Sequence, residues 1–441
     1  MKKLLLTGVM LVSMVSQAQT WSQKNSNFPT ASTLVRDMQA VSPTVAWAYA
    51  ALAGTGAPNI QEYTKTTDGG ATWVSGNINL GNTALQISDL TAADANNAWV
   101  AVNGANQGIW KTSNGGTTWT KQATASFSGA GSFPNTVYFW DANNGVAMGD
   151  PDVSGGRFEI YTTSNGGTNW TRVPAGNLPA TSNEYGYTTI KAAAGNTIWF
   201  GTDLGRVMKS NDKGLTWTVI GTPILDFGGI TLPGNSGSLT LKDANTAWVM
   251  DQDGLLFVTN NAGVNWDLVD VVSGTVYTGD LKYVPGTANT LITGGASLAQ
   301  RGSSISYDGG LNWTTLTPDA SNTDPGITAL AAFNPSTIYG GAFRSPSGTG
   351  GMNKLGALLA TANPNAIKAA VSVYPNPTKG QVHIESKSAV KSIVLVDMNG
   401  RSVKTFENMK QLDLSGLQKG VYMLNVTLAD GQKTSTKLIK E

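Results

Sequence analysis

The chain has 441 residues, enough for two or three domains or for one large repeat array. It carries 29 Lys and Arg against 28 Asp and Glu, and a formal net charge of +1 gives no support for nucleic acid or an anionic membrane as partner. The absence of cysteine excludes disulfides, thiolate metal sites and cysteine nucleophiles.

Residues 1–18 have the features of a secretory signal peptide. Two lysines precede an apolar run over residues 4–15, and Ser16 and Ala18 are the small residues of a cleavage site. A bilayer-spanning helix needs about 20 apolar residues, so an N-terminal anchor helix is the weaker alternative. No later segment reaches that length, and we expect no transmembrane segment.

An eight-residue pattern recurs six times: Ser or Thr, any residue, Asp or Asn, any residue, Gly, two residues, Trp. The copies span residues 66–73, 112–119, 163–170, 210–217, 259–266 and 306–313. Strand-like segments flank each copy, so the pattern predicts a turn between antiparallel strands. The polar side chains would accept turn N–H groups, the Gly would supply a positive φ, and the Trp would be buried. These structural residues are Asp68, Trp73, Asn114, Trp119, Asn165, Trp170, Asp212, Trp217, Asn261, Trp266, Asp308 and Trp313.

A second, apolar pattern keeps the same interval and predicts a buried strand in each repeat. Its copies are residues 43–50, 97–102, 144–149, 197–202, 246–251 and 337–342. Four strands in about 45–50 residues make one blade of a β-propeller. The fold class is therefore all-β.

The two ends of the array predict a seventh blade. We expect strands at 337–343 and 356–361, a loop at 344–354, and the start of another turn pattern at 361–363. The segment around Trp21 would complete that last blade and close the ring. The prediction is a seven-bladed β-propeller over residues 19–365, with six or eight blades as alternatives.

The six turn patterns resemble the Asp-box (BNR) repeats of sialidases, two-propeller xyloglucanases, sortilin-type receptors and photosystem II assembly-factor propellers. The resemblance implies a propeller whose Asp boxes are structural turns at the blade periphery, away from any ligand site. It does not choose among functions, because these families differ widely.

Composition changes after residue 365, and residues 366–441 read as a small Ig-like β-sandwich. They resemble the type A sorting domain of the type IX secretion system; a generic carbohydrate-binding module is the alternative. The resemblance implies the type IX machinery as partner, and delivery through the periplasm and outer membrane of a Gram-negative bacterium to its surface or beyond. The matching residues include Pro375, Asn376, Pro377, Gly380, Gly420, Tyr422, Lys437 and Lys440.

No catalytic motif stands out in the propeller. The single histidine, His383, lies in the C-terminal domain between Val382 and Ile384 and should face solvent. Histidine-based catalysis or metal binding is therefore excluded in the propeller. A carboxylate pair could still hydrolyse glycosides, although acids that only line a wet channel are the alternative. The candidates on or near predicted inner strands are Asp37, Glu184, Asp226 and Asp280, with Asp89 and Asp243 also placed there.

Binding candidates are weaker still. Arg36 is the one propeller arginine expected on an inner strand, so an arginine triad like that of sialidases cannot form. Asp150 and Asp152 in a Gly-rich loop could hold Ca²⁺, or only form a turn. Tyr185, Tyr187 and Tyr277 could contact a sugar or peptide, or pack in the core.

These observations predict a monomeric, surface-delivered binding or adhesion propeller without a cofactor, whose ligand is a glycan or a protein. A secreted glycoside hydrolase is the alternative, and an assembly or chaperone role is the third.

Overall fold

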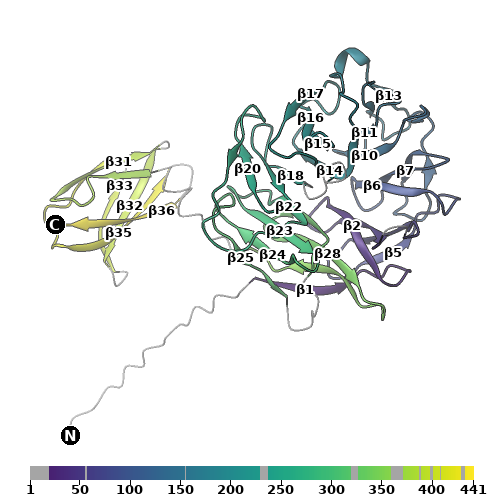
Figure 1. Ribbon diagram of the computed structural model, residues 1–441. Helices are drawn as coiled ribbons and strands as arrows, with labels where there is room; N and C mark the ends of the chain where they lie inside the picture. Colours follow the sequence, from purple (N-terminus) through teal and green to yellow (C-terminus); the bar gives the residue numbers. More distant parts are fainter. Residues whose placement is uncertain are drawn as a thin grey trace, which may run out of the picture. The chain divides into compact units, whose positions relative to one another are not determined.

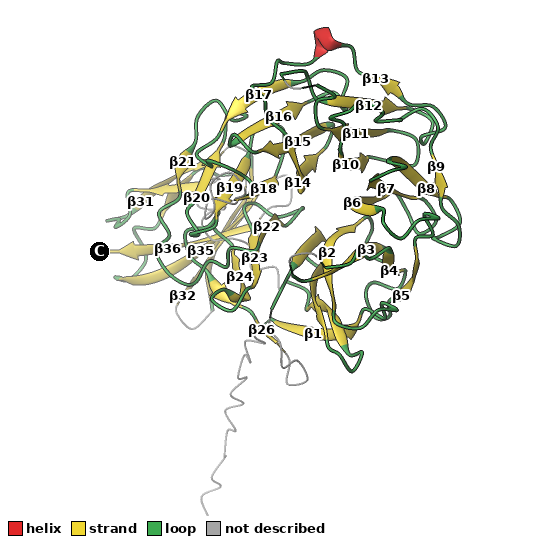
Figure 2. Cartoon of the chain, turned by 45° about the vertical axis from the view of Figure 1, so that its right-hand side comes forward, coloured by secondary structure: helices red, strands yellow, loops and turns green. Residues whose placement is uncertain are grey.

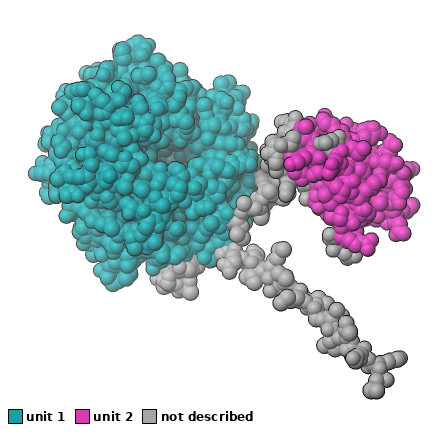
Figure 3. Space-filling view, turned by 180° about the vertical axis from the view of Figure 1, so that it is seen from behind, with its two compact units in different colours: residues 1–358 teal, residues 359–441 magenta. Residues whose placement is uncertain are grey.

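The computed structural model describes residues 19–54, 57–153, 155–228, 237–318, 326–358, 371–386, 389–397, 401–407, 409–428 and 433–441. The chain divides into two compact units, residues 1–358 and 359–441 (Figure 3). Both are built from strands; in the described residues the one helical element is a 3-10 turn, η1 (Ala175–Asn177). The all-β prediction is confirmed. The signal-peptide prediction lies outside the described residues.

Five sheets of four antiparallel strands follow one another along unit 1 (Figure 2). In each sheet the spatial order of the strands is their chain order, so every connection is a hairpin. The sheets are β6 (Gln86–Ala92), β7 (Ala98–Asn103), β8 (Gly108–Thr112) and β9 (Thr120–Lys121); β10 (Pro134–Phe139), β11 (Gly145–Gly149), β12 (Glu159–Thr163) and β13 (Thr171–Arg172); β14 (Gly186–Ala194), β15 (Thr197–Thr202), β16 (Arg206–Ser210) and β17 (Thr218–Gly221); β18 (Gly237–Leu241), β19 (Ala247–Asp251), β20 (Leu256–Thr259) and β21 (Asp267–Leu268); and β22 (Asp280–Tyr283), β23 (Leu291–Ala296), β24 (Arg301–Ser306) and β25 (Thr314–Thr315).

A sixth, nine-stranded sheet joins the two ends of unit 1. One part is a four-stranded meander of β2 to β5, and a single residue pair, Leu34 with Phe343, links it to the rest. Its strands are β1 (Thr20–Asn25), β2 (Thr33–Ala40), β3 (Ala46–Leu52), β4 (Glu62–Thr66), β5 (Val74–Asn77), β26 (Thr317–Pro318), β27 (Ala329–Asn334), β28 (Thr337–Arg344) and β29 (Gly350–Leu355).

The first strand of each four-stranded sheet, together with β2 and β27 of the nine-stranded sheet, forms a closed ring. β2 contacts β6, and the contacts continue through β10, β14, β18, β22 and β27 back to β2. In Figure 1 these strands surround the centre of unit 1, and Figure 3 shows a hollow there. Residues far apart in sequence therefore face one another across a central space.

The N-terminal strand β1 is not one of these first strands; it completes the last group of strands beside β29, as the sequence predicts. It pairs antiparallel with β29, and Trp21 faces Leu355. The predicted strand at 337–343 is confirmed as β28, but the predicted bounds of the strand after it are wrong. Much of the expected loop at 344–354 is strand β29, while residues 356–358 are not strand. Gly350 and Gly351 suggest a loop in the sequence, but pairing with β28 and β1 on both sides holds them in a strand. The expected start of a turn pattern at 361–363 lies outside the described residues.

The six recurring patterns, here called the repeat turns, share one hydrogen-bond scheme. Each joins the third and fourth strands of its sheet. In the first, the Gly70 N–H donates to Thr66 Oγ at 2.8 Å, and the Thr72 N–H donates to Asp68 at 3.0 Å. Gly70 has a φ of 83°, a conformation that favours glycine. The other five copies repeat both bonds at 2.8–3.0 Å. The polar residues of the pattern therefore stabilise the turn, as predicted.

The second strands form the core of unit 1. Trp47, Trp99 and Trp199 lie in β3, β7 and β15 and are fully buried. The Trp that ends a repeat turn reaches the neighbouring sheet in several repeats: Trp119, for example, packs against Tyr63 of β4 with ring centroids 6.1 Å apart. Burial of these aromatic rings ties adjacent sheets together.

Unit 2 contains two sheets around one apolar core that includes Val382, Ile393 and Leu424. His383 is exposed between two buried neighbours, as predicted. The predicted sorting residues support this unit locally: Asn376 Oδ1 accepts the Ile439 N–H at 2.9 Å. The side chain of Lys437 lies outside the described part. The sheets are β30 (Val371–Tyr374), β31 (Gln381–Ser386) and β34 (Gln411–Asp413), and β32 (Val390–Asp397), β33 (Ser402–Glu407), β35 (Gly420–Leu428) and β36 (Lys433–Lys440).

Candidate functional site

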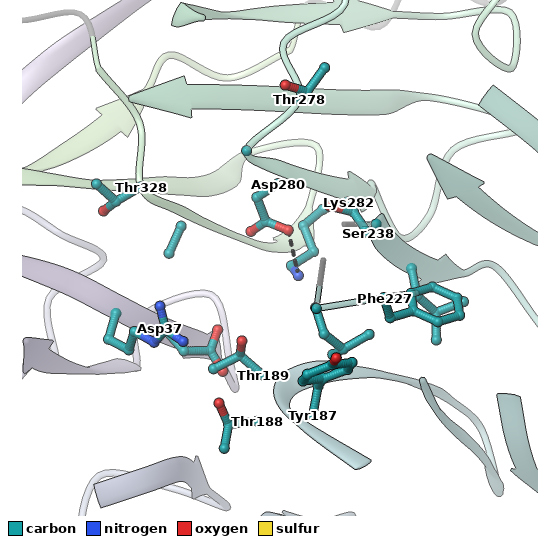
Figure 4. A pocket seen from close by; sticks show the side chains of 17 residues that line it. Asp37, Tyr187, Thr188, Thr189, Phe227, Ser238, Thr278, Asp280, Lys282 and Thr328 are labelled. Atoms are coloured by element: carbon teal, nitrogen blue, oxygen red, sulfur yellow. Dashed lines mark hydrogen bonds and ion pairs between the residues drawn. The ribbon is translucent and has the colours of Figure 1, made fainter. Parts of the chain in front are cut away.

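The main candidate is a cavity of about 350 Å³ at the centre of unit 1 (Figure 4). Its walls come from β2, β14, β18, β22 and β27 and from the loops before them, so four sheets build it. Hydroxyl groups and charges dominate the lining. The polar side chains are Arg36, Asp37, Tyr187, Thr188, Thr189, Ser238, Thr278, Asp280, Lys282 and Thr328.

A second cavity of about 190 Å³ shares four lining residues with the first: Asp37, Thr189, Leu239 and Lys282. The remainder of its lining is more aliphatic and includes Tyr138 and Lys191. The shared residues therefore separate two spaces along the centre of the sheets.

Five charged side chains from four inner strands meet at this boundary, and we call them the floor cluster: Asp37, Asp89, Lys191, Asp280 and Lys282. Lys191 forms ion pairs with Asp89, which is fully buried, and with Asp37 at 3.5 Å. Lys282 pairs with Asp280 at 3.0 Å, an interaction drawn in Figure 4. Three carboxylates thus face two ammonium groups.

Two of these aspartates also join neighbouring sheets. Asp89 of β6 accepts the N–H of Val137 in β10 at 2.9 Å, and Asp280 of β22 accepts the N–H of Leu330 in β27 at 2.8 Å. Burial raises the pKa of both carboxyls, and the paired lysines oppose that rise. Burial lowers the pKa of Lys191, but the attraction of Asp89 and Asp37 outweighs it and leaves that pKa raised.

The other candidate acids lie outside the floor cluster. Buried Glu184 forms an ion pair with Arg206. Asp226 is also buried and accepts hydrogen bonds from Tyr187 Oη at 2.6 Å and from the Gly228 N–H at 3.0 Å. Asp243 is not on an inner strand: it follows β18 and accepts two turn N–H groups, which suits a short polar side chain.

Of the predicted ligand-binding residues, Arg36 and Tyr187 line the cavity and Tyr185 and Tyr277 do not. Arg36 is exposed on β2, and it forms no ion pair within the described residues. Tyr187 is buried, and burial, together with its hydrogen bond to Asp226, raises its pKa. Its ring is therefore part of the wall and not an open stacking face.

The acids of the Gly-rich loop have separate partners. Asp152 pairs with Arg172 at 3.1 Å. Asp150 accepts the Asn135 amide at 2.6 Å and the Gly186 N–H at 2.8 Å, and burial raises its pKa to about 6. No group of three or more ligating side chains that could hold a metal ion occurs in the described ranges.

Sequence reasoning missed Lys191 and Lys282, which organise the floor cluster. The one available signal is their position, because each is a lysine inside a strand expected to line the centre. Their partners come from other repeats, so no local motif reveals the pairing.

The C-terminal segment matches a known family model. Residues 372–441 match the secretion system C-terminal sorting domain. The chain is therefore exported by the type IX secretion system to the cell surface or outside the cell. No helix in the described part of the chain is long and apolar enough to cross a membrane.

Solved structures resemble the chain in fold, while no curated protein matches its sequence. YCF48 bound to D1 peptide aligns with a TM-score of 0.52 and 14% identity, covering 78% of this chain and 98% of that one. PorZ, a surface component of the type IX secretion system of Porphyromonas gingivalis, aligns at 0.50 and 14% over 92% of this chain and 59% of its own. The GH74 xyloglucanase of Xanthomonas campestris aligns at 0.50 and 14%, over 93% and 59%. These likenesses show a β-propeller fold alone.

Proposed function

We propose that this chain is a type IX cargo whose seven-bladed Asp-box β-propeller, residues 19–365, binds a glycan or protein ligand in its central cavity at the cell surface. Seven first strands in contact around the centre support the blade count. The shared hydrogen bonds of the repeat turns support the Asp-box assignment. Residues 366–441 would be an Ig-like sorting sandwich.

One observation carries the choice of binding over catalysis: three of the four candidate acids already have close protein partners. Glu184 is paired with Arg206, Asp226 with Tyr187, and Asp280 with Lys282. A glycosidase needs two carboxyls, one to donate a proton and one to attack or activate water. Asp37 has a longer contact than these three: its partner Lys191 lies 3.5 Å away. A single available acid suits binding.

The second candidate is a glycoside hydrolase. Asp37 and Asp280 line the same cavity, and burial raises the pKa of Asp280, as a general acid requires. If Lys282 turned away when a sugar entered, these two residues would form the acid pair.

The experiment that separates the candidates uses the purified full chain on a glycan array and on an array of surface proteins. The same polysaccharides are assayed for new reducing ends. Binding without product release supports the proposal. New reducing ends that vanish in both Asp37→Asn and Asp280→Asn, but not in Asp243→Asn, would establish the hydrolase. Silence on both arrays and in the assay would reject a role in ligand binding.

A further inference from the structure

Among themselves, the five side chains of the floor cluster carry one more negative charge than positive charges. Asp37, Asp89 and Asp280 contribute three negative charges, and Lys191 and Lys282 contribute two positive ones. The side chains of Asp37 and Lys191 are 14% and 12% exposed, so water screens this imbalance poorly. Asp37 shares Lys191 with Asp89, and a carboxylate that shares its cation in such a place favours a further cation from outside.

Asp37 is the carboxylate with the longest ion-pair contact in the cluster. Lys191 makes a shorter contact with Asp89 than its 3.5 Å contact with Asp37, and Lys282 lies 3.0 Å from Asp280. One oxygen of Asp37 accepts its neighbour's N–H, from Met38, at 2.8 Å. Asp37 lines both central cavities, so a group entering from either side can reach it. Figure 4 shows Asp37, Thr189 and Lys282 around the same open space.

The surrounding wall suits an alkylammonium group better than a metal ion. Metal ions need several ligating side chains together, and the described residues offer no such group. An ammonium group needs one carboxylate and a few hydroxyl acceptors. Thr188 and Thr189 line the same cavity as Asp37 and supply them.

Peptides fit this cavity better than sugars. Neutral and acidic sugars bring no positive charge to Asp37. The cavity's aromatic side chains, Tyr187 and Phe227, are buried in its wall and offer no open ring for a sugar to lie on. At the same cavity, exposed Arg36 forms no ion pair in the described chain and can hold a carboxylate. A ligand with both an ammonium and a carboxylate is most simply a peptide.

We propose that the cavity binds a peptide segment of another protein through a primary amine, a lysine side chain or an amino terminus, which forms an ion pair with Asp37. An acidic group of the same segment then pairs with Arg36. This inference rests on the proposed binding function and specifies its ligand. The ligand supplies the cation that the floor cluster lacks.

The test uses an array of short peptides, each with a lysine or a free amino terminus, and the same peptides with those amines acetylated. The full chain should bind some free-amine peptides at least tenfold more tightly than their acetylated forms, because acetylation removes the charge. Asp37→Asn should lose at least tenfold in affinity for them. Asp243→Asn, in an exposed turn away from the cavity, should bind as wild type does.

Each possible result of this test either supports or overturns the inference. Equal binding of free and acetylated peptides overturns the inference, and that comparison needs no variant, so it stands even if Asp37→Asn folds poorly. Equal binding by folded Asp37→Asn and wild type also overturns it. Binding to glycans alone rejects the peptide ligand but leaves the proposed function standing. No binding on peptide, protein or glycan arrays rejects both.

Discussion

Replacement of Lys191 by Met tests whether the floor cluster stabilises the ring of sheets. The substitution keeps the length of the side chain and removes the ammonium, leaving Asp89 buried without its cation. Loss of one partner of a buried ion pair costs about 3–5 kcal/mol in the free energy of unfolding. At roughly 2 °C per kcal/mol for a unit of this size, the Tm should fall by about 6–10 °C.

The pH dependence of this loss has a definite sign. Burial raises the pKa of Asp89 in the folded chain, and removing Lys191 raises it further. A carboxyl whose folded pKa exceeds its unfolded value of about 3.9 contributes stability below that pH and loses it as the pH rises through the folded pKa. Lys191→Met should therefore be closest to wild type near pH 4 and weakest near pH 8.

Thermal and urea unfolding at pH 4.5, 6 and 8 measure both effects. The matched control is Lys213→Met, because Lys213 forms a half-exposed ion pair with Asp141 at 3.7 Å that should contribute less than about 1 kcal/mol. Asp89→Asn in the Lys191→Met background should restore part of the stability. Equal losses in Lys191→Met and Lys213→Met would refute the reasoning.

Three further predictions concern single sites. Gly116→Ala should destabilise unit 1 by roughly 2–3 kcal/mol in urea unfolding, because φ at Gly116 is 92° and the new Cβ would lie 2.2 Å from the Tyr63 ring. The control is Gly81→Ala, where φ is 77° and the space around the new Cβ is open; it should cost about 1 kcal/mol. Asp68→Ala should cost about 1 kcal/mol, because it removes the acceptor for the Thr72 N–H, and hydrogen exchange should quicken in that turn while the other turns are unchanged. Burial raises the pKa of Asp150 to about 6, so the stability that this carboxyl contributes is present below pH 4 and lost as the pH rises through 6. Asp150→Asn should therefore raise stability at pH 8 by about 3 kcal/mol; an unchanged stability difference from pH 4 to 8 would contradict this.

Much of the fold could be predicted because residues close together in the sequence specify its turns and strands. A repeat turn needs only a hydroxyl, an Asx side chain, a glycine and a tryptophan within eight residues, and all six copies form the same hydrogen bonds. The alternation of Val382, His383 and Ile384 likewise placed His383 at the surface. The prediction that the segment around Trp21 lies beside the C-terminal end of the array is also confirmed, because β1 pairs with β29.

The candidate site could be predicted only in part. Asp37 and Asp280 were named because inner strands must line the centre, and both line the cavity. Glu184 was expected to face the same space, but it pairs with Arg206. Which charged groups neutralise one another depends on distances that no local pattern contains.

The sequence by itself determined the strands, the repeat turns and the sorting domain, because short-range hydrogen bonding and hydrophobic periodicity specify them. Only the tertiary structure decided that Asp37, Lys191 and Lys282, from three different sheets, share one boundary between two cavities. It also decided that β29 is a strand, because its two partners lie at opposite ends of unit 1. Closing a chain into a ring brings distant residues together, and their charges then balance or fail to balance across the centre.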